Sequence, residues 1–240
     1  MESPMDALNR AAEAVATSVE AVFNDLEGVA RAVQTAAADM PVKPGRSQFA
    51  FLKDRLLMLI KKHSRVVEGA GVAYAPGSLR EVELWLEWWR DQPGAKPRFK
   101  MHDLSPNSIR YYDYSSRDWF RIPASTGHPA AVGPYVDMGG GDVNTITLTC
   151  PAPTQYGTHV LGCDASLSRL EEIFLRALGT RRPTVVLVSA NGRVITSNSA
   201  RLVAGTLMSD DHARVIASRS VSATDTARLP WKVLALNNLP

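Results

Sequence analysis

The sequence has few cysteines and no long apolar run near its start. Its 240 residues include only Cys150 and Cys163, too few for a disulfide framework. Both end neighbouring strand-like runs, so they can lie close in space, and we interpret them as buried, reduced thiols. The longest purely apolar run near the N-terminus, from Leu56 to Ile60, is far too short to cross a bilayer. Neither a disulfide scaffold nor an N-terminal spanning helix is therefore indicated.

A secretory signal is also missing. Residues 1–6 are acidic and lack the basic and apolar segments of a signal peptide. The net charge is only +3, and the basic residues are scattered apart from pairs such as Lys61-Lys62. A nucleic-acid groove needs a concentrated positive face. We predict a soluble, cytoplasmic protein with no nucleic-acid and no membrane partner, although an excised ectodomain with an added methionine would look similar.

Signatures of catalysis and metal binding are absent as well. Gly139-Gly140-Gly141 lacks the Gly-Lys-Ser/Thr ending of a phosphate loop, so a hairpin turn is expected there. There is no Gly-x-Ser-x-Gly elbow, and His102, His128 and His159 have no metal-ligand spacing. We predict no enzymatic activity, no cofactor and no metal. The composition, 45% apolar and 21% charged, is typical of a globular domain with a sizeable core.

The first segment carries a heptad-like apolar seam that predicts a long helix. Spacings of four and three alternate along it, through Leu8, Ala12, Val15, Val19, Val22, Leu26, Val29 and Val33. Two interpretations stay open, because an apolar seam does not show which surface it packs against. The helix lies against its own domain, or it also forms a homodimer through Leu8–Val33.

The middle of the chain predicts a short helix followed by strands. Ser47 is expected to cap a helix that runs to about His63. Strands are expected over 69–75 and 82–88, with another starting at Phe99. Residues 103–135 show few clean periods, and such a long irregular stretch is usually functional.

Strands and helices alternate in the last hundred residues. Strands are expected over 135–138, 145–150 and 158–164, the last two joined through Pro151–Gly157, and a helix from Ser166 or Ser168 to Gly179. A hairpin over 184–188 and 193–196 turns at Asn191-Gly192. A helix near 210–218 and a strand over 231–236 complete a smaller C-terminal α+β unit.

Seven polar and aromatic residues suggest a site for a small zwitterion, and they are Tyr112, Arg117, Trp119, Phe120, Tyr135, Asp137 and Asp164. Arg117 offers a planar fork for a carboxylate. Tyr112 and Trp119 can donate hydrogen bonds while walling a pocket with apolar surface. Asp137 and Asp164 can accept from an ammonium group. Spacing alone does not bring these residues into one pocket.

The order of these residues resembles a family pattern. Tyr112-x4-Arg117-x-Trp119-Phe120, then Pro134-Tyr135-x-Asp137, then Gly162-Cys163-Asp164 resembles the amino-acid motif of double-Cache sensor domains. The resemblance implies that Tyr112, Arg117 and Trp119 hold a ligand carboxylate, while Tyr135, Asp137 and Asp164 hold its α-amino group. Phe120 stands where the family often has Tyr, so it keeps the ring and loses the hydroxyl.

The same resemblance implies an α+β fold in which a long N-terminal helix packs on a PAS-like antiparallel sheet. We divide the chain into N-terminal helices over 1–64, a Cache ligand-binding domain over 65–178, and a small, truncated second Cache-like unit over 179–240. The expected function is a non-enzymatic sensor that binds a free α-amino acid and signals to an unknown regulatory protein partner. A dimeric scaffold with a relict pocket is the alternative, and an enzyme acting on amino acids ranks last.

Overall fold

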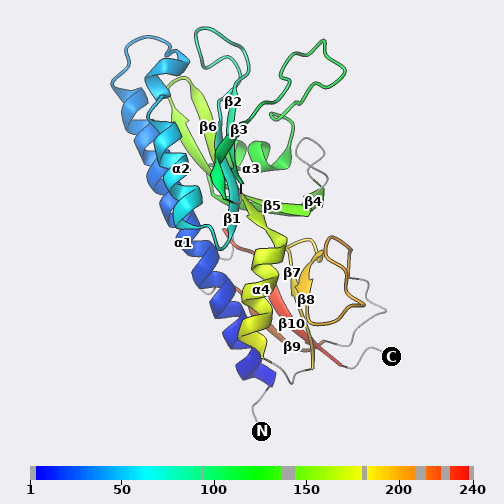
Figure 1. The fold of residues 1–240 in the computed structure, drawn as a ribbon. Helices are drawn as coiled ribbons and strands as arrows, with labels where there is room; N and C mark the ends of the chain where they lie inside the picture. The colour runs from blue at the N-terminus through cyan, green and yellow to red at the C-terminus, as the bar shows by residue number, and fades with distance from the viewer. Residues whose placement is uncertain are drawn as a thin grey trace. The chain divides into compact units, whose positions relative to one another are not determined.

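The computed structural model describes residues 4–92, 94–136, 144–179, 183–208, 215–222 and 228–237 (Figure 1). The chain divides into two compact units. The large-sheet unit comprises Ala21–Val132 and Thr147–Asp164, and the small-sheet unit comprises Met1–Glu20, Gly133–Ile146 and Ala165–Pro240. The predicted class, α+β with a long N-terminal helix, a large antiparallel sheet and a smaller C-terminal sheet, is confirmed.

The apolar seam forms one long helix, α1 (Pro4–Ala38). Every seam side chain from Leu8 to Val33 is at most 6% exposed in the single chain. The seam therefore packs against the chain's own core, as the first interpretation held. A homodimer through Leu8–Val33 stays a prediction. No helix in the described ranges combines the length and the apolarity that a bilayer crossing requires.

A short 3-10 helix, η1 (Arg46–Phe49), precedes α2 (Leu52–Lys62). Gly45 caps η1, and the Ser47 hydroxyl contacts Gln48 instead, so the predicted cap at Ser47 is wrong. Asp25 of α1 accepts from Lys62 Nζ and pairs with His63 Nε2, each at 2.6 Å. The hydrogen bond from Lys62, helped by His63, holds the pKa of Asp25 below its usual value. This contact joins the two neighbouring helices (Figure 1).

Six antiparallel strands form the large sheet in the order β3-β2-β1-β6-β5-β4. They are β1 (Val67–Ala73), β2 (Leu86–Gln92), β3 (Ala95–Lys100), β4 (Ala130–Val136), β5 (Asn144–Thr154) and β6 (Gly157–Ser166). The central strands are buried over most of their length on both faces, so the sheet forms the middle of a core. The predicted turn at Gly139–Asp142 lies outside the described residues.

Three strand predictions need correction. The strand expected over 82–88 begins only at Leu86, because Gly77 N donates to Glu83 O at 2.7 Å and makes residues 77–85 a closed loop. The strand expected to start at Phe99 in fact ends at Lys100. Pro151 and Pro153 lie within β5 rather than in a loop, and the hairpin turns two residues later.

The irregular stretch 103–135 contains a helix, α3 (Asp118–Thr126). Its interior Pro123 and its short polar segments hide the helical period. The Arg117 carbonyl accepts from the amides of Phe120 and Arg121 and starts the helix. Gly127, at a φ of 72°, ends it in the left-handed region that favours glycine.

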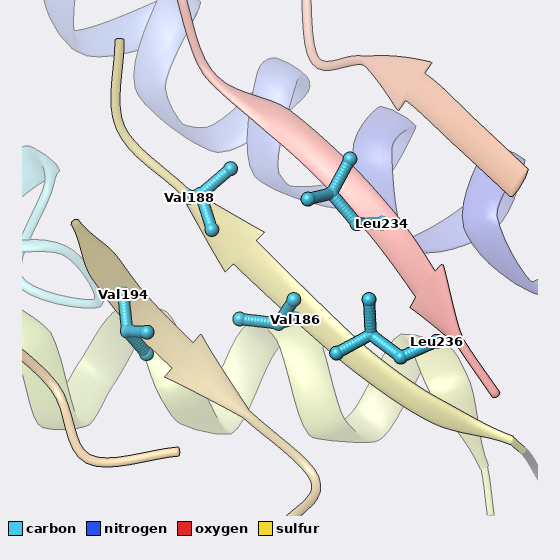
Figure 2. Packing of buried hydrophobic residues seen from close by; sticks show 5 residues of the cluster. All are labelled: Val186, Val188, Val194, Leu234 and Leu236. Atoms are coloured by element: carbon cyan, nitrogen blue, oxygen red, sulfur yellow. The ribbon is translucent and has the colours of Figure 1, made fainter. Parts of the chain in front are cut away.

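The small sheet has the order β8-β7-β10-β9, with β7 (Thr184–Val188), β8 (Val194–Ser197), β9 (Val215–Ser220) and β10 (Lys232–Leu236). Figure 2 shows its apolar cluster of Val186, Val188, Val194, Leu234 and Leu236 on three neighbouring strands. α4 (Leu167–Leu178) starts at its N-cap Ser166 and stops at Gly179. The 184–188/193–196 hairpin, the strand over 231–236 and the helix to Gly179 are confirmed.

The helix predicted near 210–218 is wrong for the part that the structure describes. Residues Val215–Ser220 form the edge strand β9, which pairs antiparallel with β10. Pairing with a neighbouring strand has overridden a local pattern that suits either element.

Candidate ligand-binding site

The central strands of the large sheet present two different faces, because side chains alternate along a strand. One face carries the alternate residues Gly69, Gly71, Thr147, Thr149, Gly162 and Asp164. The other carries Ala70, Val72, Leu148, Cys150, Leu161 and Cys163, all at most 1% exposed. We call the first the polar face and the second the aliphatic face. The polar face is buried too, which is unusual for threonines and a carboxylate.

Asp164 is the only acidic residue among the buried polar side chains of the described chain, with 6% of its surface exposed. Its Oδ2 accepts from the indole Nε1 of Trp88 at 2.9 Å. Its Oδ1 accepts from the Thr147 hydroxyl at 3.1 Å. Each carboxylate oxygen is thus held by a donor from a different strand, which fixes the plane of the carboxylate.

The Trp88 indole lies across glycines of two other strands. A Cβ on Gly71 would overlap the Glu87 carbonyl oxygen and the Trp88 ring. A Cβ on Gly69 would lie 3.3 Å from Trp88 Nε1, and one on Gly162 would lie 2.8 Å from Cη2. Glycine at these three positions gives the ring the space that it needs to reach Asp164.

The start of α3 adds an aromatic wall around the same indole. Trp119 and Phe120 are 5% and 6% exposed. The Trp119 ring centroid lies 5.7 Å from that of Trp88 and 6.4 Å from that of Tyr114. Tyr114 donates to the Tyr74 carbonyl at 2.7 Å, and burial raises the pKa of Tyr114 to about 12. The wall is therefore fixed both by ring packing and by a buried hydroxyl.

Arg117 and Tyr112 lie at the rim of this region. The Arg117 side chain is exposed and its guanidinium lies 5.6 Å from the centroid of the half-buried Tyr112 ring. Tyr112 also stacks on His102 at 5.0 Å between ring centroids. A guanidinium held over a ring while it faces solvent is accessible to a carboxylate.

Of the two remaining predicted residues, Tyr135 and Asp137, the structure describes only Tyr135. Tyr135 lies half-buried near the end of β4, and Asp137 lies outside the described residues. Among the predicted residues of the large-sheet unit, the structure brings Trp119 to the Trp88 indole that contacts Asp164, and it brings Arg117 to Tyr112. The roles of all seven as ligand contacts stay predictions. No group of three or more potential metal ligands occurs in the described part of the chain.

Sequence reasoning missed Trp88 and Thr147, which contact the Asp164 carboxylate. Glycines at alternate positions of β1 and again in β6 were the available signal, because a strand with Gly at i and i+2 leaves room for a large neighbour. Tyr74 lies on the other side of the sheet from this site and packs against Phe49 and His159, with ring centroids 5.4 and 5.1 Å away.

His159 belongs to the aliphatic face. Its Nδ1 accepts from the Ala75 amide at 3.0 Å, so the proton lies on Nε2, for which the described residues provide no hydrogen-bond partner. Burial lowers the pKa of His159 to about 4. Burial also raises the pKa of the Cys163 thiol on the same face, with a smaller contribution from the Asp164 charge. Cys150 and Cys163 are both buried, as predicted.

The fold is that of Cache, or PDC, sensor domains. Residues 60–172 match the family of methyl-accepting chemotaxis protein-like first PDC sensor domains. The chain thus contains a Cache/PDC sensor domain like the ligand-binding domains of chemoreceptors, which confirms the resemblance seen in the sequence. A comparison with curated protein sequences found no match.

Several solved structures share the fold at low sequence identity. The ligand-binding domain of the Pseudomonas aeruginosa amino acid chemoreceptor PctB, in complex with L-Arg, aligns at a TM-score of 0.65 and 16% identity over 98% of this chain and 93% of that one. PctC of the same organism, in complex with GABA, gives 0.61 and 18% over 95% and 96%. Pseudomonas fluorescens CtaA, in complex with L-valine, gives 0.60 and 16% over 97% and 94%.

Proposed function

We propose that this protein is a non-enzymatic sensor whose Cache domain binds a free α-amino acid. The ligand carboxylate lies on the Arg117 side, with Tyr112 and Trp119, and the amino group lies on the side of Asp164, with Tyr135 and Asp137. Binding changes the affinity for a regulatory partner protein by shifting the population of two conformations. A cytoplasmic location stays a prediction, which cell fractionation tests.

The buried, oriented carboxylate of Asp164 is the observation that carries the proposal. Removing a carboxylate from water is costly, and the Trp88 indole and the Thr147 hydroxyl hold the Asp164 carboxylate in one orientation on the buried face. An ammonium group brings the opposite charge as well as hydrogen-bond donors, so it pairs with a carboxylate more strongly than a neutral donor does. A fixed carboxylate on a buried sheet face is therefore suited to a cationic group that arrives with a ligand.

The opposite end of the site favours an amino acid over a plain amine. Arg117 lies exposed beside Tyr112, and a simple amine would give its guanidinium no partner. The similar domains PctB and CtaA carry L-Arg and L-valine in their structures, which supports the same ligand class for this chain.

A thermal-shift screen tests the proposal directly. We would screen the purified protein against the common amino acids, biogenic amines, small carboxylates and purines. A ligand at one hundred times its Kd adds about 2.7 kcal/mol of stability, which raises Tm by roughly 5 °C or more in a chain of this size. We expect one or a few amino acids to produce this shift.

The matched variants are Arg117→Ala and Arg121→Ala. Arg121 lies on the same exposed start of α3 but pairs with Asp118 at 2.6 Å. We expect Arg117→Ala to abolish the shift and Arg121→Ala to keep it. A shift from amines or purines alone, or none at all, contradicts the proposal and leaves the scaffold with a relict pocket as the better function. Turnover of a bound amino acid would instead identify an enzyme.

A further inference from the structure

We propose that Trp88 is a positioning residue of the ligand site: its indole holds the Asp164 carboxylate in the orientation that receives the ligand's ammonium group. The inference rests on the proposed function and assigns a role to a residue outside the family's motif. It predicts that the indole N–H of Trp88 acts on the amino group of the ligand alone.

The hydrogen bonds to Asp164 give the first reason. Trp88 Nε1 donates to Asp164 Oδ2 at 2.9 Å, and the Thr147 hydroxyl donates to Asp164 Oδ1 at 3.1 Å. Because both oxygens accept a hydrogen bond, rotation about the last side-chain bond would break both of these contacts. Because the carboxylate is already ordered in the free protein, ligand binding loses no entropy by ordering it. Rigid supporting side chains raise affinity in this way.

The fit of the ring gives the second reason. The indole is 4% exposed and lies over Gly69, Gly71 and Gly162, positions where a side chain would strike the ring or the backbone beside it. The donor that points at Asp164 is therefore itself immobile. Three glycines on two strands make room for this ring, whereas an exposed tryptophan would not require glycine at those positions.

The contact with Trp119 gives the third reason. The two ring centroids lie 5.7 Å apart, and Trp119 belongs to the proposed carboxylate side. One residue thus contacts both the acidic end of the site and its aromatic wall.

Trp89, the next residue of β2, provides an internal control. Its Nε1 also donates to a carboxylate, that of Glu87, at 3.0 Å. Adjacent strand residues point to opposite faces, so Trp89 makes the same kind of bond away from the polar face. Trp88→Phe and Trp89→Phe therefore remove the same group and keep an aromatic ring, and only the first change affects Asp164.

The experiment measures Kd by calorimetry for the tightest binder among the twenty common L-amino acids and for the same molecule without its amino group. We expect Trp88→Phe to weaken the amino acid at least 10-fold and the deaminated carboxylate less than 2-fold. Trp89→Phe should change both less than 2-fold. A purely structural role would weaken both ligands equally in Trp88→Phe, and that result overturns the inference.

A measurement on the unaltered protein keeps the inference testable if Trp88→Phe does not fold. The chain has five tryptophans, whose indole N–H groups give separate signals in a ¹H–¹⁵N spectrum. Saturation with the amino acid should move the Trp88 signal more than that of Trp89. An unmoved Trp88 signal in a protein that binds amino acids refutes the role of Trp88 alone. Failure of the wild type to bind any amino acid refutes the proposed function and this role with it.

Discussion

The two faces of the same central strands are both buried, but their side chains differ in chemistry. The aliphatic face is a continuous set of Val, Leu, Ala and Cys side chains, into which His159 fits as a neutral ring. The polar face carries glycine, threonine, a carboxylate and the Trp88 indole. Burying polar groups costs stability unless hydrogen bonds compensate for the lost water. The aliphatic face therefore stabilises the fold, and the proposed function gives a reason for the polar groups on the other face.

The largest expected effect comes from closing the space that the polar face reserves. In Gly71→Ala, the new Cβ meets the Glu87 carbonyl oxygen and the Trp88 ring, and a backbone atom cannot yield cheaply. We expect a loss of about 3 kcal/mol in the free energy of unfolding, measured by urea titration. A loss below about 0.5 kcal/mol would contradict the close packing of the Trp88 indole against Gly71.

Acid should damage the aliphatic face through His159. Since burial lowers its folded pKa from 6.5 to about 4, the unfolded state binds a proton first as the pH falls. Above pH 6.5 this group has no effect, and between 6.5 and 4 it should cost about 3 kcal/mol of stability in total. Urea titrations across this window should show the loss. His159→Asn, which keeps an acceptor for the Ala75 amide, should remove that part of the pH dependence, and an unchanged slope would exclude His159 as its source.

Two threonines of β5 separate binding from stability within the polar face. The Thr147 hydroxyl donates to Asp164, whereas that of Thr149 donates to the Ala130 carbonyl at 3.1 Å. We expect Thr147→Val to weaken amino-acid affinity about 10-fold, or about 1.4 kcal/mol. Thr149→Val should leave Kd unchanged and lower stability by about 1 kcal/mol. Calorimetry of both variants makes the comparison, and equal effects on Kd would show that Thr147 has no special part.

The smallest effect concerns a glycine without a packing role. Gly28 lies inside α1, and an added Cβ would approach only the Arg31 guanidinium, at 3.8 Å. We expect Gly28→Ala to stabilise the protein by about 0.5–1 kcal/mol, opposite in sign to Gly71→Ala. Urea titration of the pair checks this, and a destabilised Gly28→Ala variant would mean that helix α1 needs the small residue.

Much of the fold could be predicted because it follows from short-range chemistry. The seam from Leu8 to Val33 has a helical period, and Asn191-Gly192 favours a hairpin turn, so neither depends on distant contacts. Helix α3 and strand β9 escaped prediction for the opposite reason. Pro123 interrupts the helical pattern of α3, and β9 owes its form to pairing with β10.

The candidate site was predictable only in part. The spacing from Tyr112 to Asp164 pointed to a family motif, and the family is confirmed. Trp88 and Thr147 could not be found in the same way, because their role depends on which strands become neighbours. Strand β2 pairs with β1 rather than with β6, and only a folded sheet brings the Trp88 indole across β1 to Asp164.

The most direct test of binding on the polar face is a calorimetric titration of Asp164→Asn with the tightest amino acid from the screen. Asparagine has nearly the same shape as aspartate, so the variant should fold, while its amide removes the charge that an ammonium group needs. We expect Kd to rise at least 100-fold, with unfolding still cooperative. A Kd within 2-fold of the wild type would contradict an amino-acid site at Asp164.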